Sequence, residues 1–250
     1  MDPFNELIIK NQDYITKVFT INKFHQNVLI HYGLKIPQKI FYNYVESEIC
    51  EIPRIKFKNR ICFIGRITKE KNLDLLIASM KIIEGLELVI IGGENYTENE
   101  NKNKNIIWKG VLQKDKIISE LRECDYLVVP SSTEGLPFVI LEAMNIGIPC
   151  LYSRIIGSDE LIGKEGQRGF TFELKGYEDC KMKMDWSVFE KVDAHFNENI
   201  ENIGKCIKNA YNIPVMNWNK MSNNCKKFVK NKYLEDIAIC ENIKSFEILL

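Results

Sequence analysis

The sequence lacks a net charge, a long apolar run and the start of an export signal. Its 34 basic and 34 acidic residues cancel, so no bulk attraction to nucleic acid or to an anionic membrane is expected. No apolar run approaches the ~18 residues of a membrane helix. The first residues, MDPFNELIIKNQD, have neither the basic start nor the apolar core of a signal peptide. We therefore expect a cytoplasmic protein without a transmembrane segment.

The cysteines and histidines lack the spacing of a disulfide framework or a metal site. The chain has 8 cysteines but no CxxC pair, and Cys62 and Cys150 lie within apolar runs. Buried thiols in a reducing compartment account for this usage better than disulfides or zinc. His25, His31 and His195 also lack metal-ligand spacing. The sequence predicts no metal site.

Short apolar runs alternate with longer segments of helical periodicity. The runs are apolar throughout, as expected for parallel strands that are covered on both faces. They are residues 61–65, 86–93, 105–110, 125–131, 148–153 and 169–173. Between them, helical spacing is kept by Leu73, Leu76, Ile77 and Met80, and again by Ile117, Ile118 and Leu121. This alternation predicts an α/β fold, a Rossmann-like parallel sheet flanked by helices over residues 55–180.

Two further parts flank this predicted domain. Residues 1–54 hold one short apolar stretch, a helix ending at Tyr32 and an extended segment, too little for a domain of their own. Residues 181–250 contain no convincing strand and predict two or three helices that pack on the sheet domain as a C-terminal extension. One of these helices carries the apolar series Phe189, Val192, Phe196, Ile200, Ile203 and Ile207. Residues 93–105 predict a solvated loop.

The residues that follow the first two strands suit a bound phosphate group. Ligands of open parallel sheets bind beyond the carboxyl ends of the strands. Gly65 permits close approach after the first strand, and Arg66 and Lys71 can reach a diphosphate there. Gly92 and Gly93 follow the second strand and allow another group to approach the main chain.

The segments after the third and fourth strands extend the candidate site. Val111 and Leu112 follow the third strand, and SSTEGLPFVILEAM follows the fourth. Pro137 suits the first position of a helix that Gly147 would cap. The main-chain groups at this helix start, suited to sugar hydroxyls and phosphate oxygens, belong to Gly135, Leu136, Pro137 and Phe138. Glu134 would project into the same cleft, and Glu142 sits in an apolar helix where a buried carboxylate needs partners.

Each feature also has an ordinary structural explanation. Arg66 and Lys71 could be surface charges, Glu142 could pair with a neighbouring helix, and the Gly92-Gly93 turn could serve packing alone. Their joint occurrence at successive strand ends favours a binding site.

These segments resemble the donor-binding half of retaining glycosyltransferases of the GT-B fold, glycosyltransferase family four. The resemblance rests on FIGRITKEKNLDLLIASM, LELVIIGG, GFTFE and the long block IIWKGVLQKDKIISELRECDYLVVPSSTEGLPFVILEAMNIGIPCLYS. The E-x7-E spacing of the family matches Glu134 and Glu142. The similar region runs from about residue 13 to residue 180.

The resemblance implies a role for each charged residue, with Glu134, Arg66 and Lys71 as the catalytic residues. Glu142 would accept hydrogen bonds from the ribose hydroxyls of a nucleotide, and Glu134 would bind hydroxyls of the donor sugar. Arg66 and Lys71 would hold the diphosphate and stabilise the charge that develops as it leaves.

The resemblance also implies the reaction. A sugar would pass from a nucleotide sugar, a UDP-sugar in preference to a GDP-sugar, to an acceptor with retained configuration, through front-face attack. The base would lie near Val111 and Leu112, largely against main chain. Neither a cofactor nor a metal ion is expected.

The first 54 residues depart from the family, whose acceptor-binding N-terminal domain is larger. A glycan, a lipid and a protein all stay open as the acceptor. The chain could be a piece of a longer protein, the partner of a separate acceptor subunit, a homo-oligomer, or a short descendant that only binds. A non-catalytic nucleotide-sugar-binding module and a nucleotide-sugar epimerase of related fold are the alternative functions. An apolar face left bare where the larger domain would dock predicts self-association or a partner.

Overall fold

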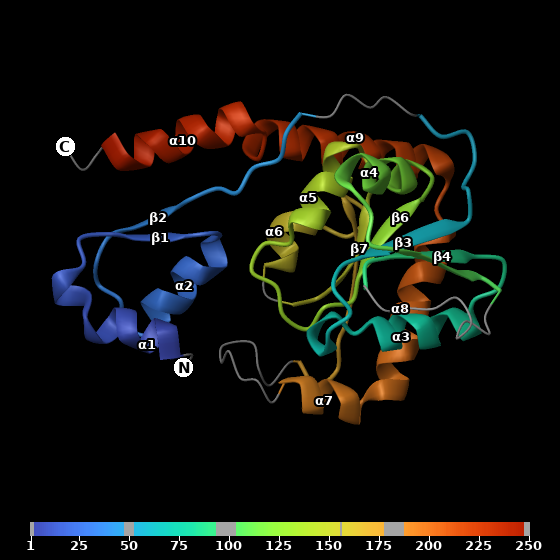
Figure 1. The fold of residues 1–250 in the computed structure, drawn as a ribbon, viewed down its shortest axis with the longest axis horizontal. Coiled ribbons are helices and arrows are strands. Elements are labelled where there is room, and N and C mark those ends of the chain that lie inside the picture. Colours follow the sequence, from blue (N-terminus) through green and yellow to red (C-terminus); the bar gives the residue numbers. More distant parts are fainter. Residues whose placement is uncertain (1–2, 48–52, 94–103, 156, 178–187, 248–250) are drawn as a thin grey trace.

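The computed structural model describes residues 3–47, 53–93, 104–155, 157–177 and 188–247. A sheet domain forms the larger part, with a small N-terminal unit beside it and helix α10 extending over that unit (Figure 1). The solvated loop predicted at residues 93–105 lies mostly outside the described residues.

Six parallel strands form the central sheet, in the order β5-β4-β3-β6-β7-β8. They are β3 (Arg60–Ile64), β4 (Glu87–Ile91), β5 (Ile106–Gly110), β6 (Tyr126–Val129), β7 (Cys150–Ser153) and β8 (Gly169–Phe172). Each lies within one of the predicted apolar runs, except that β3 begins one residue earlier, at Arg60, so the Rossmann-like prediction is confirmed. Every residue of β6 and β7 is buried, which explains why these runs do not alternate.

Helices cover both faces of the sheet. Figure 1 shows α3 and α8 on one face and α4, α5 and α9 on the other. The connecting elements are η2 (Lys69–Lys71), α3 (Leu73–Ser79), η3 (Met80–Ile82), α4 (Lys114–Arg122), α5 (Phe138–Asn145) and α6 (Ser158–Ile162). The helical spacing around Leu73 and Ile118 therefore predicted two of these helices.

A buried ion pair fastens the segment before β3 to the amino end of β6. Asp125 is fully buried, and its carboxylate lies 2.8 Å from the Arg54 guanidinium. The same carboxylate accepts the main-chain N–H groups of Lys58 and Arg60 (both 3.1 Å) and the Tyr211 hydroxyl (3.0 Å). Because a buried charge requires such partners, this network fixes where the sheet domain begins.

Four helices follow the sheet among the described residues, one more than predicted. They are α7 (Val188–Ala194), α8 (Phe196–Tyr211), α9 (Val215–Lys232) and α10 (Glu235–Glu247). The predicted apolar series runs across a break at His195, so it belongs to two helices. None of the described helices is long and apolar enough to span a bilayer.

The N-terminal unit contains a β-α-β arrangement and one preceding helix. Its elements are α1 (Pro3–Lys10), η1 (Gln12–Tyr14), β1 (Val18–Thr20), α2 (Lys23–His31) and β2 (Gln38–Ile40), with β1 and β2 paired in parallel. Helix α2 ends one residue before the predicted Tyr32. Helix α1 and the strand pairing were not predicted.

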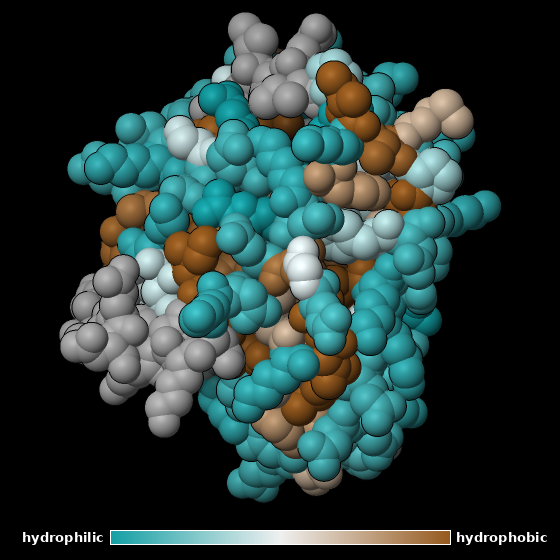
Figure 2. Space-filling view, turned by 90° about the vertical axis from the view of Figure 1, so that its right-hand side faces the viewer, coloured by the Kyte–Doolittle hydropathy of each residue, from teal (hydrophilic) through white to brown (hydrophobic). Residues whose placement is uncertain are grey.

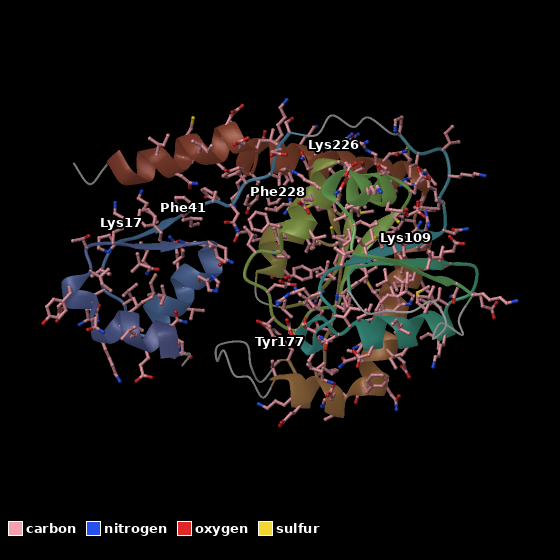
Figure 3. The ribbon with its side chains drawn as sticks, in the orientation of Figure 1. Lys17, Phe41, Lys109, Tyr177, Lys226 and Phe228 are labelled. Carbon is pink, nitrogen blue, oxygen red and sulfur yellow. The ribbon has the colours of Figure 1, made fainter. Side chains whose placement is uncertain are left out.

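Helix α10 does not pack on the sheet domain alone. The Asn242 side chain accepts the Tyr42 N–H (2.9 Å) and donates to the Tyr42 carbonyl (3.0 Å). Tyr233 packs edge-on against Tyr42 and lies 5.4 Å, centroid to centroid, from Phe228 of α9 (Figure 3). These contacts tie the segment after β2 to the junction of α9 and α10.

The surface of the sheet-domain end is mainly hydrophilic. Figure 2 shows this face, on which separate apolar groups stand among hydrophilic atoms. In the N-terminal unit, the side chains of Leu7, Tyr14 and Ile30 are more than half exposed. The predicted partner-binding face stays a prediction.

Candidate functional site

The candidate site lies where the strand order of the sheet reverses. β3 and β6 are neighbours, but the strands that follow β3 in the chain lie on one side and those that follow β6 on the other. Such a switch point opens a crevice at the carboxyl ends of the two strands. We call residues 65–72 the first site loop and residues 130–137 the second site loop.

Hydrogen bonds to main-chain carbonyls hold the two site loops together. The Ser132 N–H donates to the Glu70 carbonyl (2.8 Å), and the buried side-chain amide of Asn72 donates to the Pro130 carbonyl (2.8 Å). Asn72 has a φ of +48°, a conformation that asparagine adopts more readily than most residues. The loops therefore form one connected rim.

Lys71 and Glu134, both predicted as catalytic, meet at this rim. The Lys71 ammonium lies 2.5 Å from a Glu134 carboxylate oxygen, and the two side chains are only 19% and 11% exposed. The same oxygen accepts a hydrogen bond from the Ser131 hydroxyl (2.7 Å). This ion pair is largely buried and places a positive and a negative group side by side. Little water surrounds the two groups to weaken their electric fields.

Arg66 lies apart from this pair. Its side chain is 80% exposed and approaches only Glu70, at 3.4 Å. Burial opposes ionisation of Glu70, but the hydrogen bonds from Thr68 and from its own main chain, with the charges of Arg66 and Lys71, lower the pKa of Glu70 overall. The structure thus pairs Lys71 with Glu134 and leaves the Arg66 side chain exposed to solvent.

Packing and backbone conformation explain the two glycines after β4, whereas Gly65 after β3 would make only ordinary contacts with a β-carbon added. A β-carbon on Gly92, whose φ is +127°, would lie 1.9 Å from the Gly65 carbonyl oxygen. A β-carbon on Gly93, with φ +78°, would lie 2.3 Å from the end of Ile67. Contact between the two strand ends therefore explains these glycines without a ligand, and their binding role stays a prediction.

Helix α5 has the predicted ends, with one shift. Pro137 immediately precedes the first helical residue, Phe138, instead of occupying that position. Gly147 follows the last turn with a φ of +81°, and its N–H donates to the Met144 carbonyl (3.0 Å), which confirms the predicted glycine cap.

The start of α5 presents unpaired main-chain donors. Within the described residues, the amides of Gly135, Leu136 and Phe138 donate to no acceptor. The Phe138 side chain is 49% exposed, so it does not join the apolar interior as the sequence suggests. Free amides at a helix start favour bound oxygen atoms of negative charge.

Glu142 is a half-buried carboxylate. Burial raises the pKa of this carboxyl, against a smaller opposing effect of Lys114. Lys114 itself forms an ion pair with Glu46 at 2.6 Å. In the part of the chain that the structure describes, Glu142 has no ion pair or side-chain hydrogen bond, so pairing with a neighbouring helix does not explain it.

Val111 and Leu112 follow β5, two strands from the rim. The Val111 side chain is 66% exposed, and Leu112 packs partly against the core. The Gly92 N–H donates to the Gly110 carbonyl (2.8 Å), which joins this corner to the end of β4. Both residues therefore lie at the same edge of the sheet as the site loops.

Three polar residues of the rim were missed from the sequence. Ser132 and Asn72 connect the site loops, and Ser131 donates to Glu134 within the second loop. Only the two serines gave a signal, as polar residues that follow a buried strand. Across the described ranges, no three His, Cys, Asp or Glu side chains gather closely enough to hold a metal ion.

Residues 46–212 match the family model described as glycosyl transferases group 1. The chain is 32% identical over 156 residues to the sulfoquinovosyl transferase SQD2 of Arabidopsis thaliana, which covers 60% of this chain and 29% of that protein. It is 32% identical over 164 residues to the UDP-Gal:alpha-D-GlcNAc-diphosphoundecaprenol alpha-1,3-galactosyltransferase of Escherichia coli, covering 60% and 41%. The chain spans less than half of the length of both relatives.

Solved structures share the fold at low identity. The GtfA/B complex superposes with a TM-score of 0.76 at 15% identity, over 99% of this chain and 48% of that chain. Anabaena Alr3699/HepE in complex with UDP-glucose gives a TM-score of 0.67 at 15% identity, over 98% and 66%. At this identity the likeness concerns the fold alone.

Proposed function

The chain belongs to the group 1 glycosyl transferases, and from this membership we propose that it binds a nucleotide sugar at the site loops and transfers the sugar to an acceptor with retained configuration. The observation that carries the proposal is the Lys71–Glu134 pair at the switch point of a GT-B sheet, beside the unpaired amides that begin α5. Opposite charges and free donors at one edge suit a ligand with both hydroxyl groups and phosphate oxygens.

The diphosphate lies nearest the cations in this proposal. Lys71 already lies at the rim, and the exposed Arg66 side chain has room to turn inward from its weak contact with Glu70. As the bond from the sugar to the diphosphate breaks, negative charge grows on the leaving oxygen. Both cations stabilise that charge, an effect that is larger in the transition state than in the bound donor. No metal ion is included.

The two carboxylates, Glu134 and Glu142, bind the sugar and the ribose of the donor in this proposal. Glu134 binds hydroxyls of the sugar, and Glu142 accepts hydrogen bonds from the ribose, which supplies the partners that it lacks. The base lies near Val111 and Leu112. UDP is the proposed nucleotide, because the E. coli relative is named for UDP-Gal and Alr3699/HepE was solved with UDP-glucose.

Thermal melting with UDP, GDP, ADP and their sugar conjugates tests donor binding. A ligand that binds only the folded state at a hundredfold excess over Kd stabilises it by about 2.7 kcal/mol. We expect a clear rise in melting temperature with UDP and with one UDP-sugar. The absence of a rise with every nucleotide would overturn the proposal.

Replacement of Lys71 tests its role in the transition state. We expect Lys71→Ala to lower kcat by about 10²–10³-fold, the range for loss of one stabilising donor, with a smaller change in KM. Lys69→Ala is the matched control, because Lys69 pairs with Asp193 at 2.5 Å and is half exposed. Equal losses in the two variants would contradict the assignment. The anomeric configuration of the product, read by NMR, decides between retention and inversion.

A donor-binding subunit is the second candidate function. The N-terminal unit has only two strands among the described residues, and the chain covers 48% of the matching chain of the GtfA/B complex. Such a subunit would bind UDP but show no hydrolysis or transfer until a second acceptor-binding chain, or a second copy, is added. Transfer by the isolated monomer would exclude it.

A further inference from the structure

Asn22 joins the N-terminal unit to the second site loop. It lies between β1 and α2, and its side chain is almost fully buried. The Asn22 Nδ2 group donates to the Gly135 carbonyl at 2.8 Å, although the two residues are far apart in sequence. Beside this bond, the end of Ile21 lies 2.8 Å from where a β-carbon on Gly135 would stand.

The same side chain also begins helix α2. The Asn22 Oδ1 atom accepts the His25 N–H at 2.8 Å, as an N-cap does. Since the oxygen must face this donor, the amide nitrogen must face the Gly135 carbonyl. If the amide were flipped, its NH₂ group would face the His25 N–H, and its oxygen would face the Gly135 carbonyl oxygen. Burial makes either mismatch costly.

Resting on the proposed function, we propose that Asn22 is a positioning residue that holds the second site loop in its donor-binding conformation. The carbonyl of Gly135 and the N–H of Leu136 belong to one planar peptide group and point in opposite directions. A bond that fixes the carbonyl therefore fixes the direction of the Leu136 amide. Glu134 is the adjacent residue, so its approach to Lys71 is set by the same anchor.

The capping role alone does not account for asparagine at this position. Serine and aspartate cap helices about as well as asparagine does, yet neither offers an amide donor. A carboxylate would in addition repel the Gly135 carbonyl. Substitution of Asn22 by serine or aspartate therefore keeps the N-cap of α2 but removes the hydrogen bond to the Gly135 carbonyl.

Three variants, Asn22→Ser, Asn22→Asp and Asn22→Ala, test the assignment by titration with UDP and by thermal melting. We expect all three to weaken UDP binding by about tenfold. A loss of this size follows if the second site loop, without its anchor, occupies the binding conformation for about a tenth of the time. Asn22→Ala, which also loses the cap, and Asn22→Asp, which buries a carboxylate against the Gly135 carbonyl, should lower the melting temperature more than Asn22→Ser does. UDP affinity unchanged in both Asn22→Ser and Asn22→Asp would overturn the inference.

Hydrogen exchange of the nucleotide-free protein supplies a second readout. The Ser132 amide is bonded to the Glu70 carbonyl, and we expect it to exchange faster in Asn22→Ser and Asn22→Asp. Unchanged exchange at Ser132 would overturn the inference even if no nucleotide binds. Faster exchange together with a wild-type protein that binds no nucleotide would instead refute the proposed function alone.

Discussion

At the scale of one residue, the half-buried Glu142 carboxyl, which the proposed function assigns to the ribose, opposes stability. Burial raises the pKa of this carboxyl above the usual value for a glutamate, so the folded protein holds this proton more tightly than the unfolded chain does. The destabilisation is absent below about pH 4.5 and grows as the pH rises through the folded-state pKa. A ribose that donates hydrogen bonds to the carboxylate would reverse this unfavourable contribution.

Glu142→Gln should therefore stabilise the protein at neutral pH while it weakens UDP binding. We expect a small rise in the melting temperature at pH 7.5 and none at pH 4. Melting scans at the two pH values, with and without UDP, measure both effects. Glu84→Gln, at an exposed position, is the control. Equal shifts at both pH values would contradict the explanation.

At the scale of the element, the C-terminal end of α5 packs against helix α9, and the residue at that end must leave room for it. Gly147 adopts a left-handed conformation, and a β-carbon there would lie 2.5 Å from the Ser222 hydroxyl of α9. Gly85 is also left-handed, with φ +70°, but has nothing within 4 Å of that position. Comparison of substitutions at the two glycines therefore distinguishes the cost of backbone strain from the cost of contact between α5 and α9.

Gly147→Ala should destabilise the protein more than Gly85→Ala. Both changes incur about 1–2 kcal/mol of left-handed strain, and overlap with α9 adds about 1 kcal/mol or more in the first. Urea unfolding of the two variants measures the difference. The double variant Gly147→Ala/Ser222→Ala removes the hydroxyl and keeps a good helix former in α9, so it should recover the added part. Failure to do so would exclude the contact with Ser222 as its cause.

The sheet could be predicted from the sequence because its strands are apolar throughout. The glycine after α5 was also readable, since a left-handed cap is a local requirement. The break between α7 and α8 was not, because Val192 and Phe196 keep helical spacing across it. Helix α1 is too short for a clear period, and the pairing of β1 with β2 depends on contact between distant segments.

Within the site, the sequence identified the charged residues but not their contacts. Lys71 and Glu134 are brought together by the strand order, which no local pattern specifies. Arg66 was grouped with Lys71 by proximity in sequence, yet its side chain turns to solvent. Asn22 was missed because its partner, Gly135, belongs to another part of the fold.

At the scale of the whole molecule, Asp125 connects parts that fold from different regions of the chain. Its carboxylate binds the segment before β3 and Tyr211 of α8, and the Trp218 indole of α9 donates to its main-chain carbonyl at 2.9 Å. Tyr211 has a raised pKa, first because of burial and then because of the Asp125 charge. The Asp125 side chain is thus the centre of the network.

Asp125→Leu should destabilise the whole sheet domain strongly. The change leaves the buried Arg54 charge without its partner, which costs about 3–5 kcal/mol. Urea unfolding followed by circular dichroism measures this loss. Glu123→Ala removes the exposed pair with Lys58 and should cost less than about 1 kcal/mol. Similar losses in both variants would show that burial of the pair is unimportant.

The strand order also sets the time course of folding. Within each half of the sheet, β3 to β5 and β6 to β8, strands pair with neighbours along the chain, whereas β3 and β6 join through distant residues such as Ile61 and Tyr126. Such distant pairings form slowly, because a long loop must close first. The two site loops meet only after this seam closes. A nucleotide that binds at the site loops, as the proposed function expects, should therefore slow unfolding far more than it speeds folding, which would lengthen the lifetime of the folded protein whenever that nucleotide is abundant.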